Sequence, residues 1–108
     1  MAASAVTTDP VLTRFRKALD ETYGKRIERV VLFGSRARGD AHEDSDYDMA
    51  VFLKSYTNMW DELGLMAPVV AELSAENDTF ISAKPFPAGA YNNRTLFMHE
   101  MRQEGIDL

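Results

Sequence analysis

Two short groups of polar residues have the types and spacing needed for phosphate and metal chemistry. The first is Gly34-Ser35, which directly follows an apolar run at residues 30–33. Glycine lets the backbone approach a ligand closely, and a serine at the start of a helical turn offers its hydroxyl and nearby N–H groups to an anion. Arg36 and Arg38 add positive charge at the same place. We therefore take Gly34, Ser35 and Arg36 as candidate phosphate-binding residues.

The second group is the pair Asp46 and Asp48. If this segment is a strand, alternation puts both carboxylates on one face, ~6.6 Å apart along it. Two neighbouring carboxylates repel and raise each other's pKa unless a cation lies between them. Hard oxygen ligands of this kind suit Mg²⁺ or Mn²⁺ bound together with substrate phosphates. The pair predicts a metal site.

A third carboxylate would complete a two-metal site that activates an attacking oxygen and stabilises the leaving one. Asp78 is the natural candidate, because it stands at the start of an expected strand. Each feature alone has an ordinary structural explanation: Gly-Ser after a strand is commonly a turn, Asp-x-Asp is commonly surface decoration, and residues 76–78 read as a polar turn. The combination of these features in one short stretch is what favours a functional site.

These residues must be positioned by a small mixed α/β domain. Asp9-Pro10 supplies an N-cap and a first helical residue, and Gly24 ends that helix. Pro68 interrupts a helical stripe from Met59 to Leu73, which predicts a kink or two short helices. Strands are expected at 29–33, 46–53 and 78–83, and a last helix at about 89–103, giving the order α-β-β-α-β-α.

Length and composition limit the classes of protein. The chain has 108 residues, no cysteine, 45% apolar residues and a formal net charge of −5. We expect one domain over residues 9–108 behind a flexible tail at 1–8. There is no cysteine-based zinc site, no apolar run long enough for a membrane span and no signal peptide, so a cytoplasmic protein is the default. The acidity argues against direct nucleic-acid binding.

Competing motifs fail on spacing. An EF-hand loop starting at Asp44 would need glycine at its sixth position and glutamate at its twelfth, where the chain has Met49 and Ser55. A P-loop needs Lys followed by Ser or Thr, which residues 34–40 lack. The Gly-x-Ser-x-Gly elbow of serine hydrolases is absent from the sequence.

Gly34-Ser35, ten intervening residues and Asp46-x-Asp48 together resemble the signature of the polymerase-β-like nucleotidyltransferase superfamily. Residues 34–39 and 45–48 are most similar to its minimal nucleotidyltransferase (MNT) branch, and the similarity runs from about residue 29 to the end. The resemblance implies a mixed sheet flanked by helices. It also implies that Gly34 and Ser35 hold the β,γ-phosphates of the nucleotide, that Asp46 and Asp48 ligate metal, and that Asp78 binds the catalytic metal and helps to deprotonate the attacking hydroxyl.

The same resemblance implies a biological role. Minimal members are commonly antitoxins paired with a HEPN-type ribonuclease toxin, and they transfer AMP from ATP to a tyrosine of that toxin. Larger relatives add a helical domain that grips the base or acceptor, which this chain lacks. Two alternatives remain open: a non-catalytic MNT-like module that neutralises its partner by binding, and a small-molecule nucleotidyltransferase of the aminoglycoside-modifying type. A homo- or hetero-oligomer is also left open.

Overall fold

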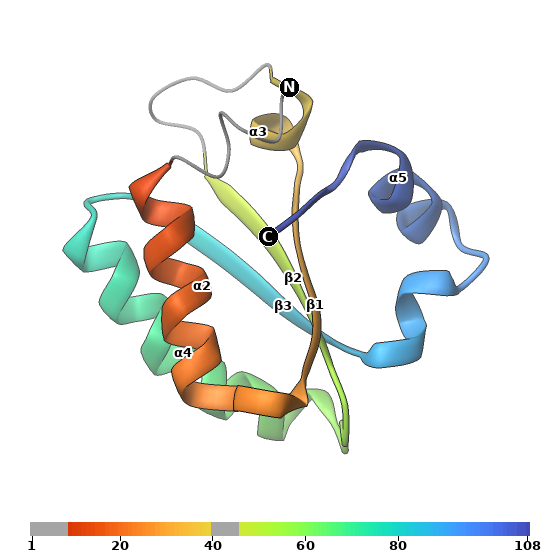
Figure 1. Cartoon of the computed structure of the whole chain (residues 1–108), viewed down its shortest axis with the longest axis horizontal. Helices are drawn as coiled ribbons and strands as arrows, with labels where there is room; N and C mark the ends of the chain where they lie inside the picture. The colour runs from red at the N-terminus through yellow and green to blue at the C-terminus, as the bar shows by residue number, and fades with distance from the viewer. Residues whose placement is uncertain (1–8, 40–45) are drawn as a thin grey trace.

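A four-stranded sheet forms the centre of the protein (Figure 1). The computed structural model describes residues 9–39 and 46–108. Strand β1 pairs antiparallel with both β2 and β4, and β3 runs parallel to β2, giving the order β3-β2-β1-β4. The mixed α/β class predicted from the sequence is confirmed. The strands are β1 (Ile27–Phe33), β2 (Tyr47–Leu53), β3 (Ile81–Pro87) and β4 (Ile106–Asp107).

Helices cover both faces of this sheet. In Figure 1, α2 and α4 lie on one face, and α5 with the short 3₁₀ segment η2 lies on the other. Within the described ranges, no helix combines the length and apolar character needed to cross a bilayer. The helical elements are α2 (Pro10–Tyr23), η1 (Gly24–Arg26), α3 (Ser35–Arg38), α4 (Met59–Glu76), η2 (Ala88–Asn92) and α5 (Leu96–Glu104).

Strand β2 supplies side chains to both cores, because successive residues of a strand point to opposite faces. Met49 and Leu53 are buried in the core formed with α2 and α4. Ala50 and Phe52 are buried in the smaller core formed with α5 and η2. By the same alternation, Asp48 lies on the α5 face of the sheet.

The third strand differs from its predicted range. It was expected at 78–83 and lies instead at Ile81–Pro87, so Asp78 precedes it. The prediction failed because Pro85 and Pro87 were read as the end of the strand. Strand β3 is at the edge of the sheet, where a residue without an N–H can face solvent without breaking the ladder.

Pro68 does not divide α4 into two short helices, one of the two outcomes expected from the sequence; a single helix spans Met59–Glu76 with Pro68 inside it. Pro68 is exposed, and Gly64, whose carbonyl loses its helical partner, is exposed as well, so water can satisfy that oxygen. The expected apolar stripe is also displaced at its start. Met59 is 50% exposed, whereas Glu62 is 2% exposed.

The expected last helix at 89–103 is divided into η2 and α5, and a short strand follows that the sequence analysis missed. Strand β4 pairs with β1 through Ile106 and Asp107. Gly105 allows this return, because a Cβ there would lie 2.5 Å from both the Met101 carbonyl oxygen and Val31 Cγ1. The chain therefore closes against β1 only with glycine at this turn.

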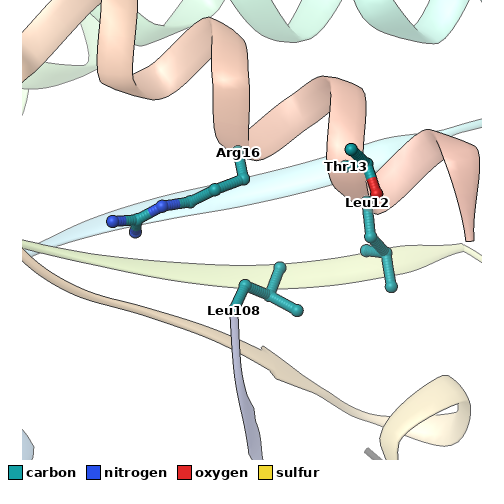
Figure 2. A pocket seen from close by; sticks show the side chains of 4 residues that line it. All are labelled: Leu12, Thr13, Arg16 and Leu108. Atoms are coloured by element: carbon teal, nitrogen blue, oxygen red, sulfur yellow. The ribbon is translucent and has the colours of Figure 1, made fainter. Parts of the chain in front are cut away.

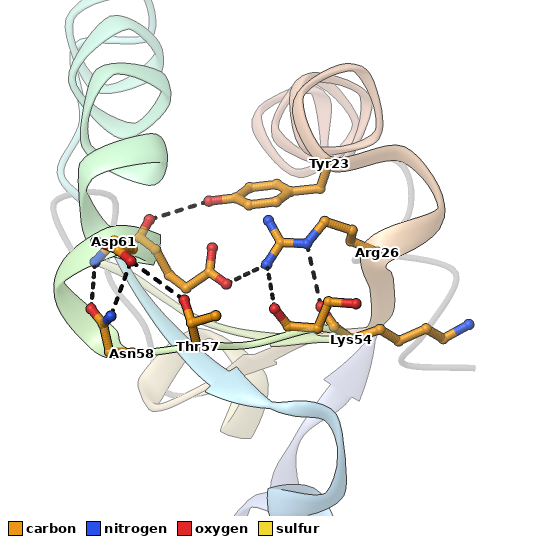
Figure 3. A network of polar contacts seen from close by, with 8 residues as sticks. Tyr23, Arg26, Lys54, Thr57, Asn58 and Asp61 are labelled. Atoms are coloured by element: carbon orange, nitrogen blue, oxygen red, sulfur yellow. Dashed lines mark hydrogen bonds and ion pairs between the residues drawn. The ribbon is translucent and has the colours of Figure 1, made fainter.

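Glu62 is buried and belongs to a polar network where α4 meets the end of α2. Figure 3 shows this network, with Tyr23, Arg26 and Lys54 among its labelled residues. The Arg26 guanidinium donates a hydrogen bond to the Glu62 carboxylate and another, of 3.3 Å, to the Lys54 carbonyl. The Tyr23 hydroxyl donates to the Glu62 carbonyl at 3.4 Å. The network links α2, α4 and the chain just after β2 at the end of β2 opposite to Asp48.

Two buried tyrosines predict a loss of stability at alkaline pH. Burial, above all, raises the pKa of Tyr23 from 10.0 to about 12, and burial followed by the hydrogen bond to Asp9 does the same for Tyr47. A raised folded-state pKa stabilises the fold below pH 10, and that contribution is lost as pH rises from 10 towards 12. We expect the melting temperature to fall across this interval.

The check is thermal unfolding followed by circular dichroism at increasing pH. The double variant Tyr23→Phe and Tyr47→Phe should flatten the alkaline decline, because phenylalanine has no proton to lose. Tyr56→Phe, at a half-buried tyrosine, is the matched control and should leave the decline in place. An equal decline in the double variant would contradict the assignment.

Candidate active site

Gly34 and Asp48 lie against each other where β1 ends and β2 begins. Phe33, the last residue of β1, is opposite Asp48 in the antiparallel register. Gly34 follows with φ 75°, and a Cβ built on it would overlap Asp48 Oδ2 and lie 3.2 Å from Asp48 Cγ. Glycine is therefore required twice, by the left-handed backbone and by the carboxylate beside it. The fold brings the Gly-Ser segment to the Asp pair as the sequence predicts.

Helix α3 begins directly after Gly34. Ser35 is its first residue, while Gly34 is the N-cap and has no side chain to cap it. The N–H groups of Ala37 and Arg38 each donate to the Gly34 carbonyl at 3.1 Å. The first N–H groups of a helix have no acceptor within the helix, so this end of α3 favours an anion. A helical turn begins at Ser35 as expected and runs to Arg38, but Gly34, and not Ser35, is its N-cap.

The two arginines of α3 point in different directions, although the sequence suggested that both add positive charge at the same place. The Arg36 guanidinium lies 3.8 Å from the centre of the Tyr47 ring, and the Tyr47 hydroxyl donates to Asp9 Oδ2 at 2.7 Å. Tyr47 belongs to the α2 core, on the face opposite to Asp48. The positive charge of Arg38, by contrast, acts on Asp48, where it opposes the rise in pKa that burial causes. The spacing of Arg36 and Arg38 in the sequence did not reveal that they point in different directions. A single helical turn has no apolar pattern that shows which of its sides faces the protein.

The electrostatics around Asp48 favour a cation. Burial raises the pKa of Asp48, and the charge of Asp46 raises it further, while Lys84 and Arg38 act in the opposite direction. Asp46 itself is exposed at the start of β2. A half-buried carboxylate with a second one two residues away is stabilised when a divalent ion neutralises both.

The structure does not bring Asp78 to this pair. Asp78 is exposed in the turn between α4 and β3, with φ 48°. The parallel register places Ser82, and not Asp78, beside Asp48. Among residues 9–39 and 46–108, no group of three His, Cys, Asp or Glu side chains is arranged to hold a metal ion.

The donor set nevertheless fits one hard divalent cation. Mg²⁺ is commonly bound through one or two carboxylates, with the remaining positions taken by water and substrate phosphates. Asp46 and Asp48 supply the carboxylates, and the start of α3 lies beside them for the phosphates.

A pocket of about 230 Å³ adjoins Gly34 between α3 and α5. In it Arg38 lies 3.7 Å from Glu104, and the Phe97 ring meets the Phe33 ring edge-on at 5.6 Å. The pocket therefore combines an aromatic wall with charged groups next to the predicted phosphate-binding segment. Its lining residues are Phe33, Gly34, Arg38, Phe97, Glu100, Met101 and Glu104.

A second pocket, of about 220 Å³, lies on the α2 face, and its lining contains none of the predicted site residues (Figure 2). Leu12, Thr13 and Arg16 of α2 face Leu108 across it. The predicted chemistry is therefore tied to the α5 face of the sheet and not to this hollow.

Comparison with known proteins agrees with this geometry. A family described as "Nucleotidyltransferase domain" matches residues 12–95. A Methanocaldococcus jannaschii protein named "Putative protein adenylyltransferase MJ0141" is 26% identical over 98 residues, which cover 91% of this chain and 95% of that protein.

Two solved structures share the fold. A toxin–antitoxin with AMP-PNP is 19% identical, with a TM-score of 0.62, over 88% of this chain and 69% of its own. The toxin–antitoxin MntA-HepT is 14% identical, with a TM-score of 0.59, over 90% of this chain and 68% of its own. Since the family match spans most of the sequence and the Gly-Ser and Asp-x-Asp segments meet in the structure, the chain belongs to the nucleotidyltransferase domain family.

Proposed function

We propose that this nucleotidyltransferase is the antitoxin of a HEPN/MNT-type pair, and that it transfers AMP from ATP to a tyrosine hydroxyl of its toxin partner. The observation that carries the proposal is the close approach of Gly34 to Asp48, which sets the turn proposed to bind phosphate against the carboxylate proposed to bind metal. Support for the substrate and the partner comes from relatives: one is named an adenylyltransferase, one fold neighbour holds AMP-PNP, and another is MntA-HepT.

In the proposed reaction, the acceptor oxygen attacks the α-phosphorus of ATP. The bond from that phosphorus to the bridging oxygen breaks, pyrophosphate leaves, and the hydroxyl proton passes to solvent. Gly34 and Ser35 hold the terminal phosphates in line, which is a positioning role. Asp46 and Asp48 would hold Mg²⁺ or Mn²⁺, which supplies neutralising charge to the phosphates.

A protein acceptor suits the open β3 side of the site. The Tyr47 N–H donates to the Phe80 carbonyl at 3.0 Å, so Phe80 lies directly beside the start of β2. Its side chain is 63% exposed. An exposed aromatic residue next to the reacting groups gives an incoming protein an apolar contact, because aromatic side chains are enriched in protein interfaces.

The test is transfer of label from ATP carrying a radioactive α-phosphate. Purified protein, Mg²⁺ and the HEPN-type toxin should give a labelled toxin, with the label on tyrosine after proteolysis and mass spectrometry. Toxin neutralised without label would support the non-catalytic binding module instead. Label on an aminoglycoside but not on protein would support the small-molecule enzyme. Either result would overturn the proposal.

Ser35→Ala should weaken ATP binding without unfolding the domain. A hydrogen bond to a charged group contributes about 1.5–3 kcal/mol, so a loss of roughly tenfold or more in affinity is expected. Calorimetry with ATP and Mg²⁺ measures the affinity, and circular dichroism checks the fold. Thr22→Ala on α2, whose hydroxyl donates to the Ala18 carbonyl, is the control. Unchanged affinity in Ser35→Ala would remove this hydroxyl from the phosphate site.

A further inference from the structure

The β3 side of the acidic pair carries no acidic side chain in register. The parallel pairing sets Ser82 beside Asp48 and Lys84 beside Ala50. Residues paired in neighbouring strands share a face, and one pair further along the aromatic rings of Phe52 and Phe86 stack at 5.3 Å. Ser82 and Lys84 therefore lie on the same face of the sheet as Asp48.

Lys84 brings positive charge to this position. Its side chain is exposed, and the register places it on the face of the sheet that carries Asp48, one residue pair further along. Asp78 lies four residues before Ser82, beyond the start of β3 and in a turn of left-handed backbone. The acceptor side of Asp48 is thus formed by a hydroxyl and an ammonium group.

We infer that this site binds a single divalent cation together with the nucleotide, because β3 presents Ser82 and Lys84 where a second cation would need a carboxylate. The inference rests on the proposed function and specifies its metal requirement. In two-metal sites the ions lie about 3.5–4 Å apart and share carboxylates. A second ion here would have Asp48 on one side and the Lys84 ammonium on the other, and among the described residues β3 adds no carboxylate beside Asp48.

A fixed positive charge on Lys84 takes over part of what a second ion would supply. An ammonium group near the acceptor attracts an oxygen that is gaining negative character, as preorganised charges do in other sites. Unlike a metal ion, an ammonium group has no coordination geometry. It therefore restricts the direction from which the acceptor oxygen approaches less than a metal ion would.

The experiment counts bound Mn²⁺ by electron paramagnetic resonance. The protein is saturated with the α,β-methylene analogue of ATP, which cannot transfer its nucleotide, and no toxin is present. Wild type should bind one Mn²⁺ tightly. Ser82→Asp should bind two, because it adds a carboxylate beside Asp48, and Ser82→Asn, matched in size but uncharged, should remain at one.

Since Lys84 could pair with the new carboxylate, the double variant Ser82→Asp with Lys84→Ala is measured alongside. Two tightly bound ions in the wild type would overturn the inference, and a fall from two to one in Asp78→Asn would assign the second ion to Asp78. The inference also fails if neither Ser82→Asp nor the double variant binds a second Mn²⁺. Absence of nucleotide binding would overturn the proposed function and the inference together, whereas two ions in wild type overturn the inference alone.

Discussion

Changing Asp46 and Asp48 together to asparagine is expected to abolish nucleotidyl transfer and, in the absence of metal, to raise the melting temperature. Transfer is lost because the amides cannot replace two anionic ligands of a hard cation. Removing a single group that stabilises transition-state charge commonly costs about 10²–10³ in rate, so the loss from both should be on the order of 10³-fold or greater.

The gain in stability follows from the electrostatics of Asp48. Burial and Asp46 raise its pKa, so the folded state holds the Asp48 proton more tightly than the unfolded state does. The carboxylate therefore lowers stability progressively as pH rises above its unfolded pKa, and the penalty is complete once pH exceeds its raised folded pKa. Asparagine has no charge to desolvate. The difference between variant and wild type should disappear at acidic pH, where Asp48 is protonated in both states.

Labelling of the toxin and thermal unfolding with a metal chelator measure the two effects in the same preparations. The control is Glu21→Gln with Glu72→Gln, which removes the same net charge at exposed positions. It should keep both transfer and melting temperature close to wild type. Retained transfer in the Asp46 and Asp48 variant would remove these residues from catalysis. A lowered melting temperature would show that they stabilise the fold.

Glu62→Met should produce the largest loss of stability among these variants. It leaves the Arg26 guanidinium without its carboxylate partner inside the network of Figure 3. Removing one partner of a buried ion pair costs about 3–5 kcal/mol. The Arg26 side chain is 32% exposed and can still reach water, so we expect the lower end, about 3 kcal/mol. For a domain of this size that corresponds to a fall in melting temperature on the order of 15 °C.

Urea unfolding of Glu62→Met, Arg26→Met and the double variant forms a mutant cycle. The double variant should be more stable than Glu62→Met alone, because no unpaired charge then remains. Nucleotide affinity at temperatures where Glu62→Met is folded should match wild type, since the network contacts Lys54 just after β2 and Asp48 is near its other end. Additive effects in the cycle would mean that Arg26 and Glu62 do not stabilise each other.

Elements with strong local patterns were predictable, and elements defined by their neighbours were not. The helix α2 and the strands β1 and β2 follow from capping residues and apolar runs, and they lie within one or two residues of their predicted ranges. Strand β3 was displaced because its prolines are compatible with a strand only at an edge, and the sequence does not reveal which strand is at the edge. The two residues of β4 are too few for any periodicity.

The same distinction applies to the candidate site. The contact between Gly34 and Asp48 could be anticipated, because both belong to strand ends joined by one short connection. The position of Asp78 could not, since it depends on how many residues the turn after α4 uses before β3 begins. Whether Arg36 or Arg38 faces the acidic pair depends on the direction in which a four-residue helix leaves β1.

The prolines of β3 also bear on how this protein avoids unwanted assembly. An open sheet edge is a template on which a foreign strand can add, through the same backbone pairing that underlies fibril growth. Pro85 and Pro87 stand at alternate positions of β3, the edge strand of the sheet. The unpaired edge of β3 therefore lacks two of the backbone N–H donors that such growth requires. This small acidic protein therefore carries resistance to edge-to-edge aggregation within its own edge strand.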